Sequence, residues 1–386
     1  MPLVIPSGMK REYLLDLAGE VISRAATLNG AASPYLKREL RLLTGIVNTY
    51  ASNLIEGHDT RPHDILRAVN SECPPKDQEA LMQAAVISAQ LQVAIDDNYE
   101  LIEDLLQPAT LNLLHRHLFN ATPELLEVPD ANFCGIPGRS RGKGMHVMVG
   151  QHVAPQGEFV DELLEGLLNY YRAQKGLSAA KLIDAAAMHH RLLFLHPFAE
   201  GNGRTVRIFT HALMHRAGAG AGGLWSISRG LARGTREFPG EPKRQYKSLL
   251  ASADKERQGG TADGRGALSL KALQEFVEWF LLVAVDQIEY MSSVYDMPRL
   301  RSRAESVWAA RLSDKPALVQ QCIPILRRLL EGELSRKDAW ALVGKSPRTG
   351  RNVVARLLEE GLIYSESERG DLRLSLSYPG LLPGLF

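Results

Sequence analysis

The chain has 386 residues, more than a single hydrophobic core usually holds, so two or three compact units are expected. Apolar residues make up 45% and charged residues 23% of the sequence, a globular balance that excludes a wholly disordered chain. With 45 Lys and Arg against 44 Asp and Glu, the net charge is +1, which excludes an overall field that would attract nucleic acid or an anionic membrane.

The cysteines and the apolar runs indicate the cellular setting. Cys73, Cys134 and Cys322 are odd in number and widely spaced, which argues against both a disulfide framework and a zinc site. The first four apolar residues are too few for a signal peptide, and no stretch approaches the roughly 18 apolar residues of a membrane span. These features predict a soluble cytoplasmic protein without membrane contact.

The N-terminal third carries helical periodicity. Apolar residues recur at helical spacing over residues 34–56, and Gly57 follows, where a helix end favours a residue that tolerates positive φ. Similar patterns predict helices over residues 75–94 and 110–119. The body of the protein is therefore expected to be all-α.

The exception lies between residues 132 and 155. Here the glycine-containing run PGRSRGKG precedes a short β-branched run, MHVMVG at residues 145–150, which predicts a strand or hairpin. A further helix is expected over residues 157–173, where apolar side chains gather on one side. A small β element is thus expected ahead of the segment that concentrates the chemistry.

That segment is residues 196–207, HPFAEGNGRTVR, with an imidazole, a carboxylate, two glycines and two arginines in twelve residues. Gly201 and Gly203 let the backbone come close to a ligand, and a helix opening at Arg204 would offer free N–H groups to an anion. The segment therefore indicates a nucleoside triphosphate site. The alternative is an ordinary helix-start turn beside a buried histidine.

Two side chains of this segment can supply the chemistry. Glu200 offers the oxygen ligand that Mg²⁺ prefers, with phosphates and water completing the shell of the ion. His196 titrates near neutral pH and is suited to accept a proton from an attacking hydroxyl. The pair therefore suggests metal-assisted attack on a phosphate.

Residues 196–207 match the pattern of the Fic family, H-x-F-x-[DE]-G-N-G-R-x-x-R, at every fixed position. The resemblance extends over most of residues 35 to 290 and implies a protein AMP-transferase, which uses Mg²⁺-bound ATP to modify a Ser, Thr or Tyr hydroxyl of a target protein or of itself. The implied roles are general base for His196, buried anchor for Phe198, Mg²⁺ ligand for Glu200, α-phosphate contacts for Gly201, Asn202 and Gly203, and β- and γ-phosphate contacts for Arg204 and Arg207.

Residues 52–57, SNLIEG, resemble the inhibitory motif [ST]-x-x-x-E-[GN] of Fic proteins that carry an N-terminal inhibitory helix. Ser52 and Glu56 share one helical face, and a carboxylate in the last turn of a helix opposes the macrodipole, so Glu56 requires a partner elsewhere. The resemblance supplies Arg207, which Glu56 would withhold from the γ-phosphate. An exposed glutamate on a frayed helix end is the alternative, and a reverse, AMP-removing activity stays open.

The predicted β element resembles the Fic flap, which aligns a target peptide by adding it as an edge strand. A merely structural hairpin is the alternative. The docking residues expected from the resemblance are Met145, His146, Val147, Met148 and Val149.

The tail from about residue 315 has a different pattern. Three helical segments and a short polar–apolar alternation follow one another, the order of a winged helix-turn-helix, with Ser346 as N-cap and Pro347 as first helical residue. Lys345, Arg348 and Arg351 are candidates for DNA phosphate contacts. Because acidic and basic residues balance over residues 331–386, a packing or dimerisation module is the alternative, and a homodimer stays open.

The predicted fold is mainly α, with an all-helical Fic core, a small β-hairpin flap and a C-terminal winged helix-turn-helix. Four regions are expected: an N-terminal helical region (1–100) with the inhibitory helix at about 35–57, the catalytic core (101–290), a helical linker (291–320) and the winged helix-turn-helix (321–386).

Two other functions remain open at this point. The first is a DNA-binding transcriptional regulator whose Fic domain senses nucleotide; the intact His196 and Glu200 favour catalysis, since a sensor needs no base. The second is transfer of phosphate, UMP or phosphocholine by the same fold, against which Gly203 and Arg204 favour nucleotidyl transfer.

Overall fold

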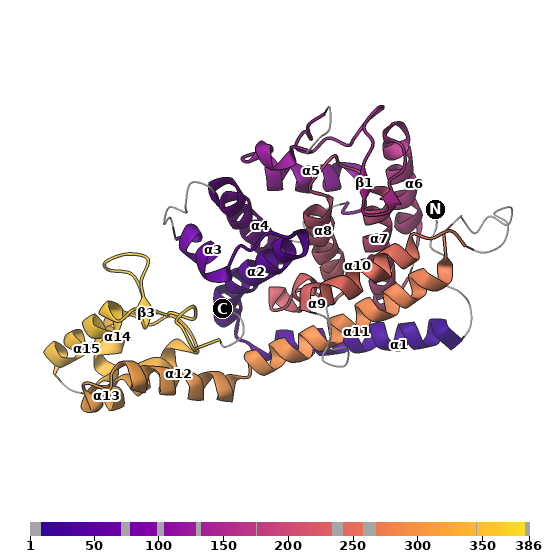
Figure 1. Ribbon diagram of the computed structural model, residues 1–386. Helices are drawn as coiled ribbons and strands as arrows, with labels where there is room; N and C mark the ends of the chain where they lie inside the picture. Colours follow the sequence, from indigo (N-terminus) through magenta and orange to yellow (C-terminus); the bar gives the residue numbers. More distant parts are fainter. Residues whose placement is uncertain are drawn as a thin grey trace. The chain divides into compact units, whose positions relative to one another are not determined.

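The computed structural model describes residues 9–70, 78–98, 104–128, 133–174, 176–233, 242–257, 268–344 and 346–382. It is mainly α-helical with two small sheets, which confirms the predicted fold class (Figure 1). The helices are α1 (Met9–Ala31), α2 (Pro34–Glu56), α3 (Pro62–Val69), α4 (Glu79–Asn98), α5 (Pro108–Phe119), α6 (Val160–Ala173), α7 (Ser178–Leu195), α8 (Asn202–Arg216), α9 (Ile227–Arg233), α10 (Pro242–Ala253), α11 (Leu270–Val294), α12 (Met297–Arg311), α13 (Pro316–Leu329), α14 (Arg336–Leu342) and α15 (Pro347–Glu359), with short 3-10 turns η3 (Pro123–Leu126), η4 (Gly157–Phe159) and η5 (Ala221–Gly223).

The chain divides into two compact units. The first comprises the described residues of Met1–Thr27 and Thr44–Glu289, and the second comprises those of Leu28–Leu43 and Tyr290–Phe386. Helices α1 and α2 each contribute residues to both units.

Helix α8 forms the centre of the first unit, where α4, α5 and α7 pack against it (Figure 1). The sequence pattern divides this helix into a polar and an apolar face, and both faces are buried: Arg207 and His211 on one, Val206 and Phe209 on the other. The helix begins at Asn202, two residues before the predicted start at Arg204. The polar face therefore contacts protein as well as any ligand at its N-terminus.

The C-terminal half of α2 lies on α4. Asn48 donates a hydrogen bond to Gln92, and the hydroxyls of Thr49 and Ser88 are 3.0 Å apart. Gly45 allows this close approach, because a Cβ at that position would stand 3.0 Å from the carbonyl oxygen of Ala89. The helix ends at Glu56 as predicted, and Gly57 follows with φ of 94°.

The β element of the first unit is a short antiparallel hairpin, β1 (Met148–Val149) and β2 (His152–Val153), paired Met148 with Val153 and Val149 with His152. It is shorter than the predicted residues 145–150, because the chain before Met148 turns, with the Met145 amide donating to the carbonyl of Gly142. Helix boundaries also differ by a few residues: α4 begins at Glu79, and the predicted start at residue 75 lies outside the described residues.

The second unit contains α12 to α15 and a two-stranded antiparallel sheet, β3 (Ile363–Tyr364) with β4 (Arg373–Leu374). Its last three helices, α13 to α15, and the hairpin follow one another in the order expected from the tail. Ser346 caps α15 by accepting a hydrogen bond from the Thr349 amide at 3.2 Å, and Pro347 is the first helical residue, as predicted.

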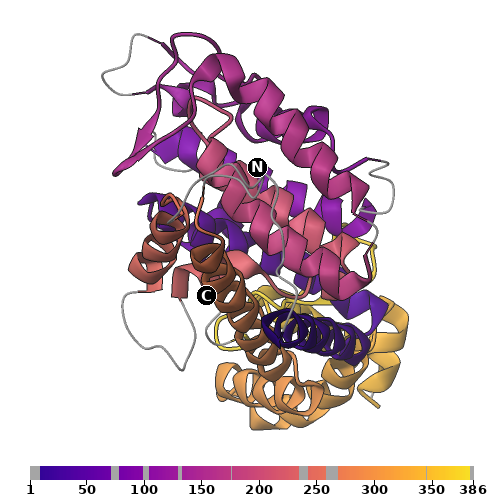
Figure 2. The same ribbon diagram turned by 90° about the vertical axis from the view of Figure 1, so that its right-hand side faces the viewer.

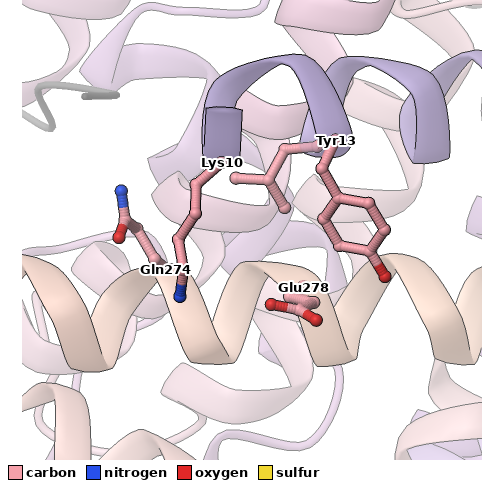
Figure 3. Close-up of a pocket in the computed structure, with 5 residues that line it drawn as sticks. Lys10, Tyr13, Gln274 and Glu278 are labelled. Carbon is pink, nitrogen blue, oxygen red and sulfur yellow. The ribbon is translucent and has the colours of Figure 1, made fainter. Parts of the chain in front are cut away.

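Helices α1 and α11 run side by side in both views (Figures 1 and 2), and Arg24 forms an ion pair with Glu289. A surface pocket between them is lined by Lys10, Tyr13 and Glu278 with two neighbours (Figure 3). Burial and the charge of Glu278 raise the pKa of Tyr13, so its phenol stays protonated.

Within the described part of the chain, no helix has the length and apolarity needed to cross a membrane.

Candidate active site

His196 is the residue that ends α7, and its backbone is left-handed with φ of 49°. A non-glycine residue in this region is strained, and such strain gathers at functional sites. Its Nδ1 lies 2.8 Å from the carbonyl oxygen of Leu193. Because a carbonyl only accepts, the proton stands on Nδ1 and the lone pair on Nε2. Burial lowers the pKa of His196, so the imidazole is held neutral and ready to accept a proton.

Arg141 fixes the backbone around His196. Its side chain donates to the carbonyl of His196 at 2.6 Å and to that of Leu195 at 3.0 Å, while its backbone amide donates to Pro197 at 2.8 Å. A third donor reaches the carbonyl of Met145, just before the hairpin, at 3.2 Å. The buried guanidinium therefore links the end of α7 to the start of the hairpin. Nothing in the local sequence pattern singles out this residue.

Asn202 holds the loop that follows His196. Its amide oxygen accepts from the Phe198 amide at 2.9 Å, and its nitrogen donates to the Phe198 carbonyl at 2.7 Å. Phe198 is buried, as expected for an anchor, and stacks on the His115 ring at 3.9 Å. Since both polar ends of the Asn202 side chain are engaged, it acts here by shaping the loop.

His115 of α5 is a second residue that sequence reasoning missed. It accepts a hydrogen bond from the Gly138 amide at Nδ1 (2.8 Å), and its Nε2 therefore donates to the carbonyl of Glu200 at 3.0 Å. Burial lowers its pKa to about 4, so this tautomer stays neutral. His115 thus holds the loop before α8 through its hydrogen bond to Glu200 and its stacking on Phe198.

The first turn of α8 is built to admit an anion. Gly201 is the residue before the helix and has φ of 77°, and a Cβ there would lie 2.5 Å from the Phe119 ring. Only glycine fits that position without strain or overlap. The helix start presents free N–H groups and the positive end of the macrodipole.

Arg204 lies in this first turn with its guanidinium buried. Its Nε and Nη1 have no hydrogen-bond partner among the described residues, and the group stands 4.7 Å from the Phe119 ring centroid. Buried N–H groups without acceptors cost free energy, and such groups call for a specific explanation. An anionic ligand at the helix start would supply the missing acceptors.

Glu56 reaches across from the end of α2 to Arg207. The carboxylate pairs with the Arg207 guanidinium, whose Nε also donates to the Ser52 hydroxyl at 2.8 Å. A Cβ on Gly203 would stand 2.0 Å from the Glu56 carboxylate, so the pair depends on glycine there. The structure therefore brings together Ser52, Glu56 and Arg207, the three residues that the sequence singles out. Arg207 lies 155 positions after Ser52 and 151 positions after Glu56 in the chain.

Electrostatics explain the position of Glu56. The macrodipole at the end of α2 repels a carboxylate, but the macrodipole at the start of α8 attracts one. Gly203, which the Glu56 carboxylate approaches, lies in the first turn of α8. Burial alone would raise the pKa of Glu56, yet the charge and hydrogen bond of Arg207 lower it below its ordinary value. The carboxylate thus occupies an anion position beside two arginines.

Glu200 is half-buried in the loop before α8, and one carboxylate oxygen accepts from the Gly201 amide at 2.9 Å. Mg²⁺ is commonly held by one or two carboxylates together with substrate phosphates. A single carboxylate beside an anion position fits that mode of binding.

The hairpin exposes apolar side chains. Met148 and Val153 are each 70% exposed and Val149 is 50% exposed. His152 anchors the hairpin to α7, with Nε2 lying 2.8 Å from the Phe194 carbonyl oxygen. Met145, His146 and Val147 lead into it. An exposed apolar hairpin tied to the helix that ends at His196 can present a bound peptide near the imidazole.

The DNA candidates belong to the second unit. Arg348 and Arg351 are exposed on α15, and the Arg351 guanidinium lies over the Trp340 ring at 5.6 Å. Lys345 lies outside the described residues. Arg356, further along α15, is paired with Glu360 and Asp314, so its charge is compensated.

Comparison with known proteins finds similarity to part of this site. Residues 105–214 match the model of the Fic/DOC family. A 72-residue segment is 33% identical to "Protein adenylyltransferase fic-1" of Caenorhabditis elegans, covering 19% of this chain and 14% of that protein. A segment of equal length is 35% identical to "Protein adenylyltransferase Fic" of Drosophila grimshawi, covering 19% of this chain and 15% of that protein. The chain therefore matches only a small part of these relatives.

A solved structure extends the likeness in fold. A Fic family protein from Desulfovibrio desulfuricans G20 aligns over 97% of this chain and 98% of its own, with a TM-score of 0.54 and 20% identity. Residues 105–214, with α8 near their end, are thus a Fic/DOC domain, and the whole chain resembles a Fic protein in fold.

Proposed function

We propose that this chain, whose residues 105–214 form a Fic/DOC domain, is a self-inhibited protein adenylyltransferase that transfers AMP from ATP to a protein hydroxyl. The buried guanidinium of Arg204 carries the proposal, because its Nε and Nη1 lack hydrogen-bond partners among the described residues and it lies at a helix start, where anions bind. The names of the relatives support AMP as the transferred group.

The triphosphate of ATP would lie along the first turn of α8. The backbone amides around Gly201 and Gly203 would bind the α-phosphate, and Arg204 and Arg207 would bind the β- and γ-phosphates. Mg²⁺, held by Glu200, would neutralise part of the negative charge on the phosphates. Two arginines and a helix start supply the positive field that an ATP site requires.

His196 would act as the general base. The target hydroxyl oxygen forms a bond to the α-phosphorus while the bond from that phosphorus to the pyrophosphate oxygen breaks, and pyrophosphate leaves with the bonding electrons. The hydroxyl proton passes to Nε2 of His196, the nitrogen whose lone pair the Leu193 carbonyl keeps available. Arg141 would position the base through the His196 and Leu195 carbonyls.

The target would bind at the hairpin. An extended peptide can pair with an exposed strand edge through its main chain, which positions a hydroxyl with little demand on sequence. The exposed Met148, Val149 and Val153 would cover apolar side chains of the target. The chain itself is also a candidate target.

Glu56 would be the inhibitor. While it holds Arg207, that arginine is not free for the γ-phosphate, so bound ATP lacks the alignment needed for in-line attack. The family resemblance also leaves open a second activity, removal of AMP, in which the same carboxylate would orient a water molecule.

Intact-protein mass spectrometry tests the transfer. The Glu56→Gly variant, incubated with ATP, Mg²⁺ and a cell lysate, should gain the mass of one AMP on itself or on a lysate protein, and Glu56→Gly with Arg204→Ala should not. Parallel reactions with UTP and CDP-choline identify the donor. A larger mass gain with either of these than with ATP would replace AMP by another group.

A DNA-binding regulator remains the second candidate, because Arg348 and Arg351 are exposed at the start of α15. Phosphate contacts there would give binding that falls steeply with salt. Fluorescence anisotropy with a random-sequence duplex at low and moderate salt would detect it. Binding unchanged in an Arg348→Ala and Arg351→Ala double variant would remove these residues from the proposal.

A further inference from the structure

Three buried polar side chains converge between α4 and α8, one turn beyond Arg207. Asp96 belongs to α4, and His211 and His215 belong to α8, four residues apart and hence on one face. The Nε2 atoms of both histidines lie 2.7 Å from the same oxygen, Oδ1 of Asp96. The exposed fractions of the three side chains are 3%, 7% and 3%.

This arrangement is unusual for a packing contact between helices. Burying a charge costs free energy unless partners compensate it, and apolar side chains serve helix packing without that cost. Oδ1 of Asp96 is the oxygen that both imidazoles face. An anionic carboxylate and two imidazoles, each directing a ring nitrogen to one point, are the donors that a transition metal binds.

We propose that Asp96, His211 and His215 form a binding site for one zinc ion, with water as the fourth ligand. The three donor atoms already lie within 4.8 Å of one another. Tetrahedral zinc bonds of about 2.0–2.2 Å separate the donors by roughly 3.3 Å. Each histidine nitrogen therefore has to move about 0.6 Å away from the carboxylate oxygen, and the two nitrogens, which are at most 4.8 Å apart, have to stand about 3.3 Å from one another.

The scattered cysteines do not bear on this site. They argue against zinc held by thiolates, whereas the donors here are two imidazoles spaced as His-x-x-x-His on a helix and a carboxylate from a second helix. Zinc requires each histidine to offer the Nε2 lone pair, so the imidazole proton moves to Nδ1 when the ion binds.

The ion would join two helices that support the candidate active site. Helix α4 carries Ser88 and Gln92, which contact the inhibitory helix α2. Helix α8 carries Arg204 and Arg207. Coordination by one residue of α4 and two of α8 would therefore stabilise the helices on which both the inhibitor and the phosphate-binding arginines depend, whichever reaction the site performs.

Metal content and thermal stability test the site in the full chain. The wild type, His211→Gln, His215→Gln and the exposed control His117→Gln are stripped with a chelator, reloaded with zinc, passed through metal-free buffer and analysed by mass spectrometry for metals. Glutamine retains an N–H that can bond to Asp96 but is a poor zinc ligand, so these variants separate metal binding from hydrogen bonding.

We expect about one zinc ion per chain in the wild type and in His117→Gln, and affinity about 100-fold lower or worse in the two site variants. Zinc should raise the Tm of the wild type and the control only. Cobalt(II) in the wild type should show the strong visible absorption of a four-coordinate site, a readout that does not need the variants to fold. Absence of bound zinc in the wild type, or equal zinc in the wild type and His215→Gln, would overturn the proposal.

Discussion

Replacing Gly201 by alanine should destabilise the protein through two separate effects. The backbone at Gly201 has φ of 77°, a left-handed conformation that costs a non-glycine residue about 1–2 kcal/mol. The added Cβ would also lie 2.5 Å and 2.7 Å from two atoms of the Phe119 ring, and overpacking of this kind costs typically about 1–3 kcal/mol. Together these effects predict a loss of about 2–5 kcal/mol in the free energy of unfolding.

A matched control separates the two effects. Gly144 has φ of 83°, and a Cβ there would meet no heavy atom within 4 Å, so Gly144→Ala should cost only the conformational part, about 1–2 kcal/mol. Urea denaturation followed by far-UV circular dichroism measures both variants. Equal losses for Gly201→Ala and Gly144→Ala would show that Phe119 does not close the space behind the loop, and would refute the packing argument.

Three further predictions concern the loop, the base and the hairpin. Asn202→Ala leaves the buried amide and carbonyl of Phe198 unpaired and should lower stability by about 2–4 kcal/mol in urea denaturation; a loss below about 1 kcal/mol would contradict the loop-holding role. Burial lowers the pKa of His196, and the base is active only when neutral. The labelling rate of the Glu56→Gly variant should therefore rise with pH, with a midpoint below 6.5, the ordinary pKa of histidine. A midpoint above 6.5 would exclude the buried neutral imidazole as the base. Met148→Glu and Val153→Glu should reduce labelling of a target protein while ATP affinity, measured by calorimetry, stays unchanged, and undiminished labelling would exclude the exposed hairpin face as the docking surface.

Local sequence features predict much of the fold because they act locally. Pro34 and Gly57 bracket α2, and the Ser346–Pro347 pair marks the start of α15, since capping and φ preferences involve only neighbouring residues. The hairpin is shorter than its β-branched run suggests, because a turn uses the Met145 amide, which donates to the carbonyl of Gly142.

The candidate site is predictable only in part. The motif at residues 196–207 and the Ser52–Glu56 pair are continuous in sequence, and a family pattern detects them. Arg141 and His115 act through backbone carbonyls and ring stacking, contacts that depend on the folded path of distant segments. The convergence of Asp96 with His211 and His215 likewise depends on the packing of α4 against α8, which no spacing along the chain indicates.

Incorporation of label from α-³²P ATP into protein tests the central claim most directly. Wild type, Glu56→Gly, and Glu56→Gly with His196→Ala are each incubated with Mg²⁺ and with a lysate as a source of targets. The pairing of Glu56 with Arg207 and the neutral imidazole of His196 predict strong labelling in the single variant alone. No label in any of the three proteins, or equal label in the single and double variants, would contradict AMP transfer with His196 as its base.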